Sequence, residues 1–182
     1  MTKAIGLVEL NSIAKGIETA DKMFKSGDVD IIISKPICPG KFIILITGDV
    51  GAVKSSVEKG IENAENYIVD SLILPKVHTQ VLEAINYTTK IEKLDALGIL
   101  EFYSIATAVV AADAVAKTSQ VQLMELRLGI GIGGKSFLTF TGDVSSINEG
   151  IEIGEKIGEE NGMLVYKSII PSPSPEIFEF LI

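Results

Sequence analysis

The sequence contains a single cysteine and a single histidine among its 182 residues. One thiol cannot form an intrachain disulfide, and it cannot hold a metal ion on its own. The N-terminal segment MTKAIGLVELNS has neither the long apolar core nor the small-residue cleavage site of a signal peptide. With no disulfide framework and no secretion signal, the sequence is that expected of a protein in a reducing cytoplasm.

Long apolar runs and basic clusters are also absent. No uninterrupted apolar stretch reaches the roughly 18 residues of a membrane-spanning helix, so we expect no membrane insertion. The formal net charge is −8 with 16 basic residues, a balance that argues against nucleic-acid binding. Mean hydropathy is nevertheless +0.38. We therefore expect the excess apolar surface to be covered at a subunit interface.

What the sequence does contain is an internal repeat. The segment that begins at Ala4, AIGLVELNSIAKGIETADKMFKSGDVDI, returns at Ala96 as ALGILEFYSIATAVVAADAVAKTSQVQL, at an offset of 92 residues. Further along the offset is 94, because the loop LGIGIGGK of the second copy replaces the shorter PICPGK of the first. Identical and apolar positions keep register together, so the repeat predicts two domains, 1–90 and 91–182.

Each copy follows the same pattern of elements. Short apolar runs predict strands, and apolar residues spaced by three or four predict helices. We expect Ser12 to cap the first helix and Gly27 to end it, and we expect Pro39 and Gly40 at the centre of a type II turn. In the first copy the predicted elements are a strand at 4–10, a helix at 12–26, strands at 29–37 and 41–47, a helix at 48–67, a strand at 71–74 and a short helix at 79–86. This order, β-α-β-β-α-β, is that of a ferredoxin-like α+β domain.

Four features together resemble a known family: an opening GLVEL or GILEF, a helix that ends in A-D-x-x-x-K, a glycine loop before a lysine, and the tripeptide GDV. The chain is similar over nearly its whole length to bacterial microcompartment (BMC) shell domains. Two tandem copies, with SKPICPGKF in the first, resemble the trimeric shell proteins of propanediol-utilisation compartments. The resemblance implies two tandem BMC domains, a flat homotrimer that acts as a pseudohexamer, a place in the compartment shell within the cytoplasm, and a structural role without enzymatic activity.

The same resemblance implies a cofactor. It places Cys38 of three chains around one [4Fe–4S] cluster on the threefold axis, one cluster per trimer, for electron transfer across the shell or for delivery of the cluster to a partner. Thiolates are also ligands for zinc, which is the alternative metal. The expected pore-loop residues are Ile37, Pro39, Gly40, Gly129, Gly131, Gly133 and Gly134. The implied partners are other copies of the chain, other shell proteins and an enclosed redox enzyme, with no nucleic acid and no membrane.

The resemblance also predicts the tile edge, the rim where neighbouring trimers would meet. Lys25 and Lys117 end their first helices at the position of the family's edge lysine, although a lysine there also complements the helix dipole. The family carries an arginine between two prolines and then a histidine, whereas this chain has Lys76 and His78 in PKVH and no arginine in PSPS. A lysine cannot reproduce the bidentate contacts of arginine. Alternatively, we expect His78 to cap the start of the following helix.

Several other interpretations stay open. Cys38 is either a cluster ligand, a small buried hydrophobe or the nucleophile of an enzyme. The protein is either a redox tile, a passive tile with a small-molecule pore and no metal, or a soluble ferredoxin-like regulator that binds small molecules. The run GIGIGGK lacks Walker spacing and leads into a strand, which argues against nucleotide binding. Glu9 and Glu101 recur in both copies, which favours a structural role such as an ion pair over acid–base chemistry. Asp49 and Asp143 are predicted to be N-caps or first-turn acids of the second helix of each copy.

Overall fold

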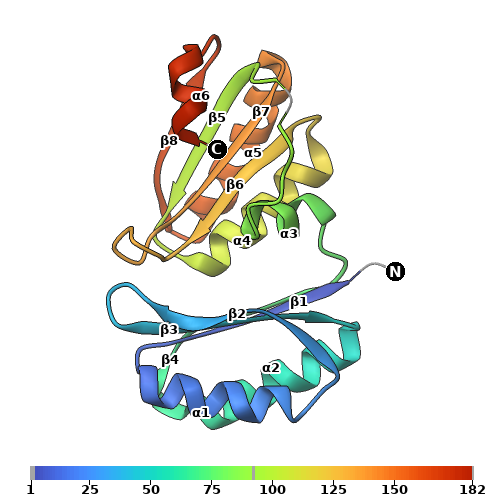
Figure 1. The fold of residues 1–182 in the computed structure, drawn as a ribbon, viewed down its shortest axis with the longest axis vertical. Coiled ribbons are helices and arrows are strands. Elements are labelled where there is room, and N and C mark those ends of the chain that lie inside the picture. Colours follow the sequence, from blue (N-terminus) through green and yellow to red (C-terminus); the bar gives the residue numbers. More distant parts are fainter. Residues whose placement is uncertain (1–2, 92, 182) are drawn as a thin grey trace. The chain divides into compact units, whose positions relative to one another are not determined.

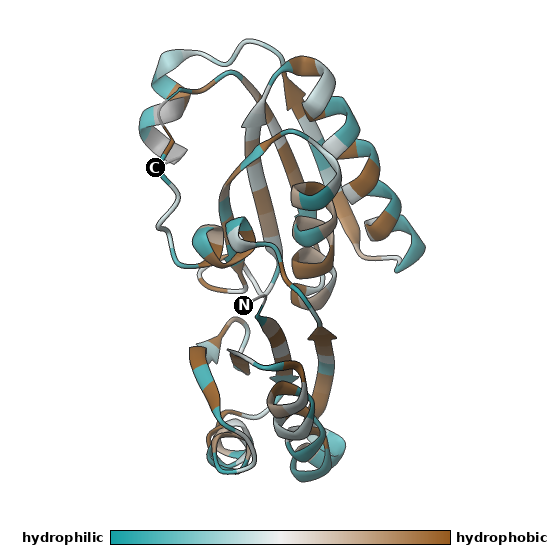
Figure 2. Ribbon diagram, turned by 90° about the vertical axis from the view of Figure 1, so that its right-hand side faces the viewer, coloured by the Kyte–Doolittle hydropathy of each residue, from teal (hydrophilic) through white to brown (hydrophobic). Residues whose placement is uncertain are grey.

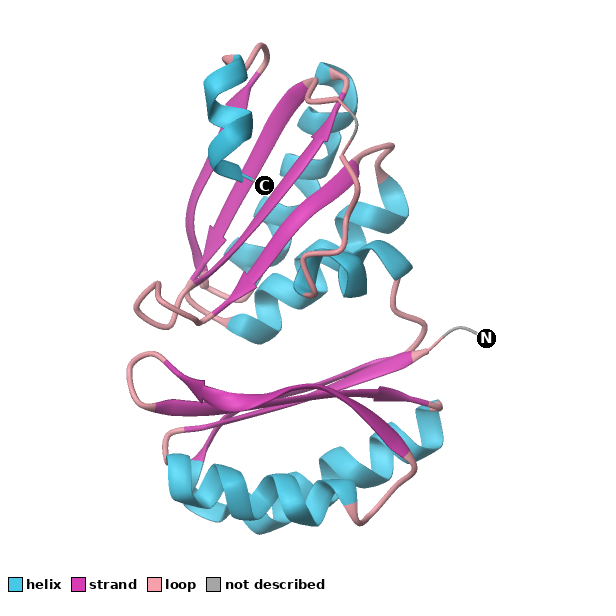
Figure 3. Ribbon diagram, in the orientation of Figure 1, coloured by secondary structure: helices cyan, strands magenta, loops and turns pink. Residues whose placement is uncertain are grey.

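The computed structural model describes residues 3–91 and 93–181, and it describes the side chains of all of these except 178, 180 and 181. The chain divides into two compact units, Met1–Val77 and His78–Ile182. Each unit contains one four-stranded sheet with helices packed on it (Figures 1 and 3). Both predicted copies of the α+β fold are therefore present.

The first unit has the element order that the repeat predicts. Its elements are β1 (Ala4–Leu10), α1 (Ile13–Phe24), β2 (Val29–Ile37), β3 (Lys41–Gly48), α2 (Val50–Ala64), a 3₁₀ turn (Glu65–Tyr67) and β4 (Ile68–Leu74). The strands pair antiparallel in the order β2-β3-β1-β4. Helices α1 and α2 lie side by side on the sheet and cover the central strands β1 and β3 (Figure 1).

The second unit repeats this arrangement. Its elements are α3 (Thr79–Ile85), β5 (Ala96–Phe102), α4 (Ile105–Thr118), β6 (Gln122–Leu128), β7 (Ser136–Gly142), α5 (Val144–Glu160), β8 (Leu164–Ile170) and α6 (Pro175–Leu181). The sheet order is β6-β7-β5-β8. Even the irregularities recur, since the register shifts in β2 near Ile31 and in β6 near Leu123 occupy equivalent positions.

Burial explains the apolar composition of the strands. In the first unit, β1 is buried along its whole length, and its Val8 and Leu10 pack with Met23 of α1 and Val57 of α2. Hydrophobic residues predominate along the strands, whereas helices such as α1 and α2 alternate hydrophobic and hydrophilic residues (Figure 2). Helix α1 approaches the sheet closely because Gly16 has no side chain: a Cβ atom there would overlap the ring of Phe42.

Three details differ from the sequence-based expectation. Helix α1 ends at Phe24 with Lys25 as its C-cap, so Gly27 is not the helix terminator. Gly27 serves close packing instead, because a Cβ atom there would lie 2.6 Å from the carbonyl oxygen of Ala52. Helix α2 is shorter than predicted and β4 is longer, since residues from Ile68 onward already pair with β1.

The third difference concerns the domain boundary. A boundary after residue 90 assigns α3 to the first domain, whereas the structure places α3 in the second unit, packed against β6 and α4 (Figure 1). Val81, Ala84 and Ile85 are the buried residues of α3. The sequence repeat gives no hint of this, because it makes α3 the last element of the first copy, as α6 is of the second.

Candidate functional site: the Cys38 hairpin

Cys38 lies at the tip of the hairpin that joins β2 to β3. The N–H of Gly40 donates a 3.0 Å hydrogen bond to the carbonyl oxygen of Ile37. The central residues of the turn are therefore Cys38 and Pro39, joined by a cis peptide bond, which is the type VI arrangement. The predicted hairpin is confirmed, but the predicted type II turn centred on Pro39 and Gly40 is wrong. Gly40 follows the turn with φ +87°, which glycine adopts without a steric penalty.

Cys38 is half-buried rather than sealed in a core. Ile37 beside it is buried, while Pro39 and Gly40 are exposed. Within the described part of the chain, no group of three or more histidine, cysteine, aspartate or glutamate residues could hold a metal ion.

An ion pair fixes the base of the Cys38 hairpin. Lys41, the first residue of β3, places its Nζ atom 2.7 Å from Oε1 of Glu9 on the adjacent strand β1. Glu9 is only 2% exposed. The second unit repeats the pair with Lys135 and Glu101. The interpretation of Glu9 and Glu101 as structural ion-pair partners is confirmed, and in both units the pair anchors the strand that leaves the loop.

The two pairs differ in burial, which gives a testable contrast. Lys41→Met leaves the nearly inaccessible Glu9 carboxylate without its cation, and we expect it to cost about 3 kcal/mol of unfolding free energy. The matched change Lys135→Met should cost less than about 1 kcal/mol, because the Glu101 side chain is 31% exposed and water can replace the lysine. Urea unfolding of both variants measures the difference; equal losses would contradict this assignment.

The second unit carries a bare glycine loop at the equivalent hairpin, between β6 and β7. Gly129, Gly131, Gly133 and Gly134 all adopt positive φ, between +66° and +81°. A Cβ atom at Gly131 or Gly133 would meet no atom within 4 Å. The loop is closed at its base by the Gly129 N–H, which donates to the Lys135 carbonyl at 3.0 Å. It leads into strand β7 and not into a helix, as the argument against a nucleotide loop requires.

The predicted edge residues lie apart from the loops. Lys25 pairs with Asp21 at 2.6 Å and Lys117 pairs with Asp113 at the same distance, each at the last turn of its helix. Lys76 is exposed and has φ +56°. Their role at a tile edge stays a prediction.

His78 caps helix α3. The His78 side chain accepts a 3.4 Å hydrogen bond at Nδ1 from the backbone N–H of Gln80. The backbone N–H of His78 donates to Oδ1 of Asp113 at 2.8 Å. Sequence reasoning proposed the cap but missed two contacts: Asp113 accepts from the backbone N–H of His78, and Gln80 of α3 accepts from the backbone N–H of Leu123. These contacts join residues 35 and 43 positions apart, Asp113 with His78 and Leu123 with Gln80, so local spacing gives no signal for them.

The predicted aspartate caps differ from each other. Asp49 and Asp143 both occupy the N-cap position of their helices. Only Asp143 makes the side-chain bond, accepting from the Ser146 N–H at 2.8 Å. That hydrogen bond holds the pKa of Asp143 below its ordinary value. The predicted side-chain cap is thus confirmed at Asp143. At Asp49 the described residues show no such hydrogen bond.

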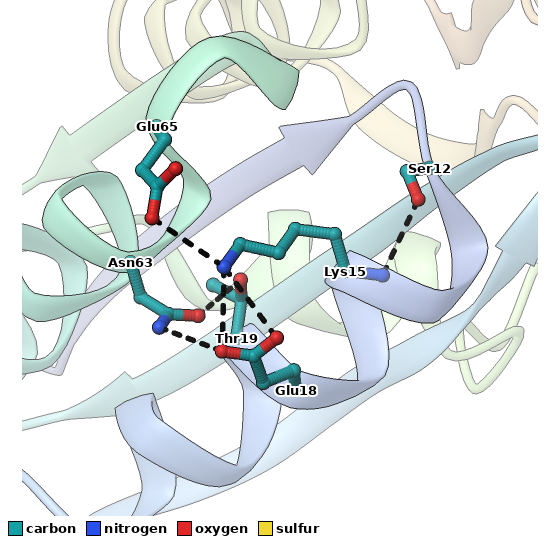
Figure 4. Close-up of polar contacts among 6 residues, drawn as sticks. All are labelled: Ser12, Lys15, Glu18, Thr19, Asn63 and Glu65. Atoms are coloured by element: carbon teal, nitrogen blue, oxygen red, sulfur yellow. Dashed lines mark hydrogen bonds and ion pairs between the residues drawn. The ribbon is translucent and has the colours of Figure 1, made fainter.

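One polar cluster of the first unit was not predicted (Figure 4). Glu18 accepts a hydrogen bond from the Asn63 amide at 3.0 Å and contacts Lys15, and these two partners hold the pKa of Glu18 below its ordinary value. Thr19 donates to Asn63 at 2.9 Å, and Lys15 also lies 3.7 Å from Glu65. These bonds tie α1 to the end of α2. The second copy has Thr107, Val110, Ala111 and Ile157 in place of Lys15, Glu18, Thr19 and Asn63, so the cluster is a helix-to-helix contact specific to the first unit.

Comparison with known proteins agrees with this geometry. The profile of the BMC domain matches residues 4–77 and 96–173. Bacterial microcompartment shell protein PduT of Citrobacter freundii is 42% identical over 182 residues, covering 100% of this chain and 99% of that protein. A crystal structure of a microcompartment protein from Desulfitobacterium hafniense is 52% identical, with a TM-score of 0.93 over 98% of this chain and 99% of the other.

A more distant structure shares the fold alone. A fused permuted hexameric shell protein of the RMM microcompartment is 16% identical, with a TM-score of 0.65 over 87% of this chain and 84% of the other.

Among the described helices, none is both long enough and apolar enough to cross a membrane.

Proposed function

The chain belongs to the BMC domain family as a structural shell protein of a bacterial microcompartment, and we propose that three copies form a tile with a [4Fe–4S] cluster on its axis. In this proposal the Cys38 thiolates of the three chains are the protein ligands of the cluster. The tile is a flat pseudohexamer, because each chain supplies two similar domains. Its partners are further copies, other shell proteins and an enclosed redox enzyme.

One observation carries the proposal: the only cysteine of the chain lies half-buried at a hairpin tip, and the described residues contain no cluster of three or more metal-binding side chains. Threefold symmetry converts one thiol per chain into three at one point. Thiolates are the ligands of iron–sulfur clusters, which ordinarily take four. Three cysteines would leave one iron to a non-cysteine ligand.

The surrounding residues suit this role. The Glu9–Lys41 pair fixes the strand that follows the turn, so the hairpin would present Cys38 at a defined position. The glycine loop of the second unit adds no side chain at Gly131 or Gly133, which would leave room for a bulky group and expose backbone N–H donors to it. When bound, the cluster supplies one-electron chemistry, either for transfer between the two faces of the shell or for delivery to a partner.

A passive tile is the second candidate, favoured by the same open glycine loop. In that case the loops surround a small-molecule pore, and Cys38 lines it without metal. Metal content separates the two functions. A soluble small-molecule regulator differs from both, because it would stay a discrete oligomer and not assemble into sheets.

The tile is tested by its mass and its assembly. Light scattering of the purified protein should give three times the 19.4 kDa of the chain, and electron microscopy at high protein concentration should show flat sheets. Both results are expected whether or not metal is bound. A discrete particle of any size that never forms sheets would favour the regulator.

A further inference from the structure

The second unit shows how a short helix covers the exposed edge of one of these sheets. Strand β6 is an edge strand, and α3 lies against it and against α4. The Gln80 side chain bonds to the backbone at the start of β6: its Oε1 accepts the Leu123 N–H at 2.8 Å, and its Nε2 donates to the carbonyl of Val121, the residue before the strand, at 3.5 Å. The His78 N–H donates to Asp113 of α4. Edge strands need such cover, because their unpaired backbone groups otherwise invite other chains.

The first unit has an equivalent surface, and among the described residues no helix packs on it as α3 packs on the second unit. Strand β2 is the equivalent edge strand, and the Asp21–Lys25 pair matches Asp113–Lys117 at the same 2.6 Å distance. Between α1 and β2 lies a groove of about 450 Å³. Its apolar lining residues are Ile17, Ala20, Phe24, Pro36 and Phe42. We call this surface the α1/β2 groove.

Two aliphatic residues of β2 and α1 are exposed, whereas their equivalents in the second unit are buried. Ile31 of β2 is 54% exposed, while its equivalent Leu123, bonded to α3, is fully buried. Ile17 of α1 is 58% exposed, while its equivalent Val109 of α4 is fully buried. Ile17, which lines the groove, and Ile31, which lies elsewhere on β2, are therefore exposed where the second unit buries the equivalent residues.

The chain also carries a second helix of the required kind. Helix α6 begins five residues after the end of β8, as α3 begins five residues after β4. The entry turn is the same, since Ile177 N–H bonds to the Ser174 carbonyl at 3.1 Å and Val81 N–H to the His78 carbonyl at 3.0 Å. In the sequence, Val81, Ala84 and Ile85 of α3 correspond to the apolar residues Ile177, Phe180 and Leu181, and Gln80 corresponds to Glu176.

We propose that α6 of one copy docks in the α1/β2 groove of the next copy, as α3 docks on α4 and β6. The equivalent site on the second unit is already taken by α3, so α6 must use a first unit. Glu176 would then accept the N–H of Ile31, and the N–H of Ser174 would donate to Asp21. Each chain offers one helix α6 and one α1/β2 groove. When chains dock head to tail into a closed ring, every helix therefore occupies a groove and no groove stays empty. The inference rests on the proposed trimer and specifies its contact.

Disulfide trapping tests the docking directly. In a Cys38→Ser background, which contains no other thiol, Ile31→Cys and Glu176→Cys are combined, because the equivalent residues Leu123 and Gln80 are hydrogen-bonded neighbours. Mild oxidation should give disulfide-linked species of two and three chains on a non-reducing gel, reversed by reductant. Each single-cysteine variant is a control, as is Val69→Cys with Glu176→Cys, because β4 lies at the opposite sheet edge. None of these controls should link above background.

The outcomes separate the docking from the trimer. Light scattering of the Cys38→Ser parent gives the oligomeric state independently. A trimeric parent without interchain links, or with links only within one chain, would overturn the docking and leave the trimer. A parent that is not a trimer would overturn both. As a second variant, deletion of residues 175–182 should reduce the trimer to single chains while circular dichroism keeps the folded signature; a truncated chain that stays trimeric would contradict the proposal.

Discussion

Cys38→Ser should remove the iron from the anaerobically purified protein, from about four atoms per three chains to background, and leave the trimer intact. A serine hydroxyl is nearly the size of the thiol but is not the soft ligand that a cluster requires. The Cys38 side chain is partly exposed, and the turn is closed by a backbone hydrogen bond between Gly40 and Ile37. The substitution therefore changes the ligand without removing a core contact. Iron analysis and light scattering on the same samples measure both effects.

Two further variants sharpen this experiment. Cys38→Ala should lose iron to the same extent, and Ser34→Ala, on the same hairpin, should keep it. If Cys38→Ser retained the wild-type iron content, the ligands would lie elsewhere. If it failed to form trimers, Cys38 would be a structural residue and the redox role would fall.

Lys25→Ala should abolish or strongly reduce the extended sheets seen by electron microscopy while the trimer survives. The Lys25 side chain is 70% exposed at the end of α1, and the resemblance to shell proteins places it where neighbouring tiles meet. Within the chain its only recorded contact among the described residues is Asp21, four positions away. Such a pair contributes about 0.3–0.5 kcal/mol, so the melting temperature should hardly change.

The matched control is Lys22→Ala, an exposed lysine in the last turn of the same helix. It removes the same charge without touching the Asp21–Lys25 pair and should form sheets normally. Wild-type sheets from Lys25→Ala would contradict the edge role. Equal loss of sheets in both variants would mean that net charge, and not this position, controls the assembly.

Much of the fold follows from local sequence signals. Ser12 and Ser104 precede the two equivalent helices, and each accepts the expected hydrogen bond from the backbone N–H three residues on. Where a signal has two physical meanings, the prediction failed. Gly27 had the place of a helix terminator, but its role is to let α2 approach. The sequence Cys38-Pro39-Gly40 permits more than one tight turn, because proline tolerates both peptide isomers within about 1 kcal/mol.

The candidate site divides in the same way. The pairing of Glu9 with a lysine was predictable, because both copies keep a glutamate on the first strand and a lysine after the loop. The surface that receives α3 was not, because Asp113 and Leu123 lie 35 and 43 residues from their partners His78 and Gln80, and only the tertiary fold brings them together. The sequence of one chain also cannot show whether Cys38 binds a metal, since the other ligands would come from symmetry-related copies.

The most direct measurement is the iron and acid-labile sulfide content of the wild-type trimer, purified and reconstituted without oxygen, together with its absorption and EPR spectra. The account predicts about four iron and four sulfide per three chains, a broad visible absorption and an EPR signal in one redox state, all of which Cys38→Ser lacks. A folded trimer that takes up no iron after reconstitution, or that holds one zinc instead, would contradict the cluster and leave a structural tile with a cysteine-lined pore.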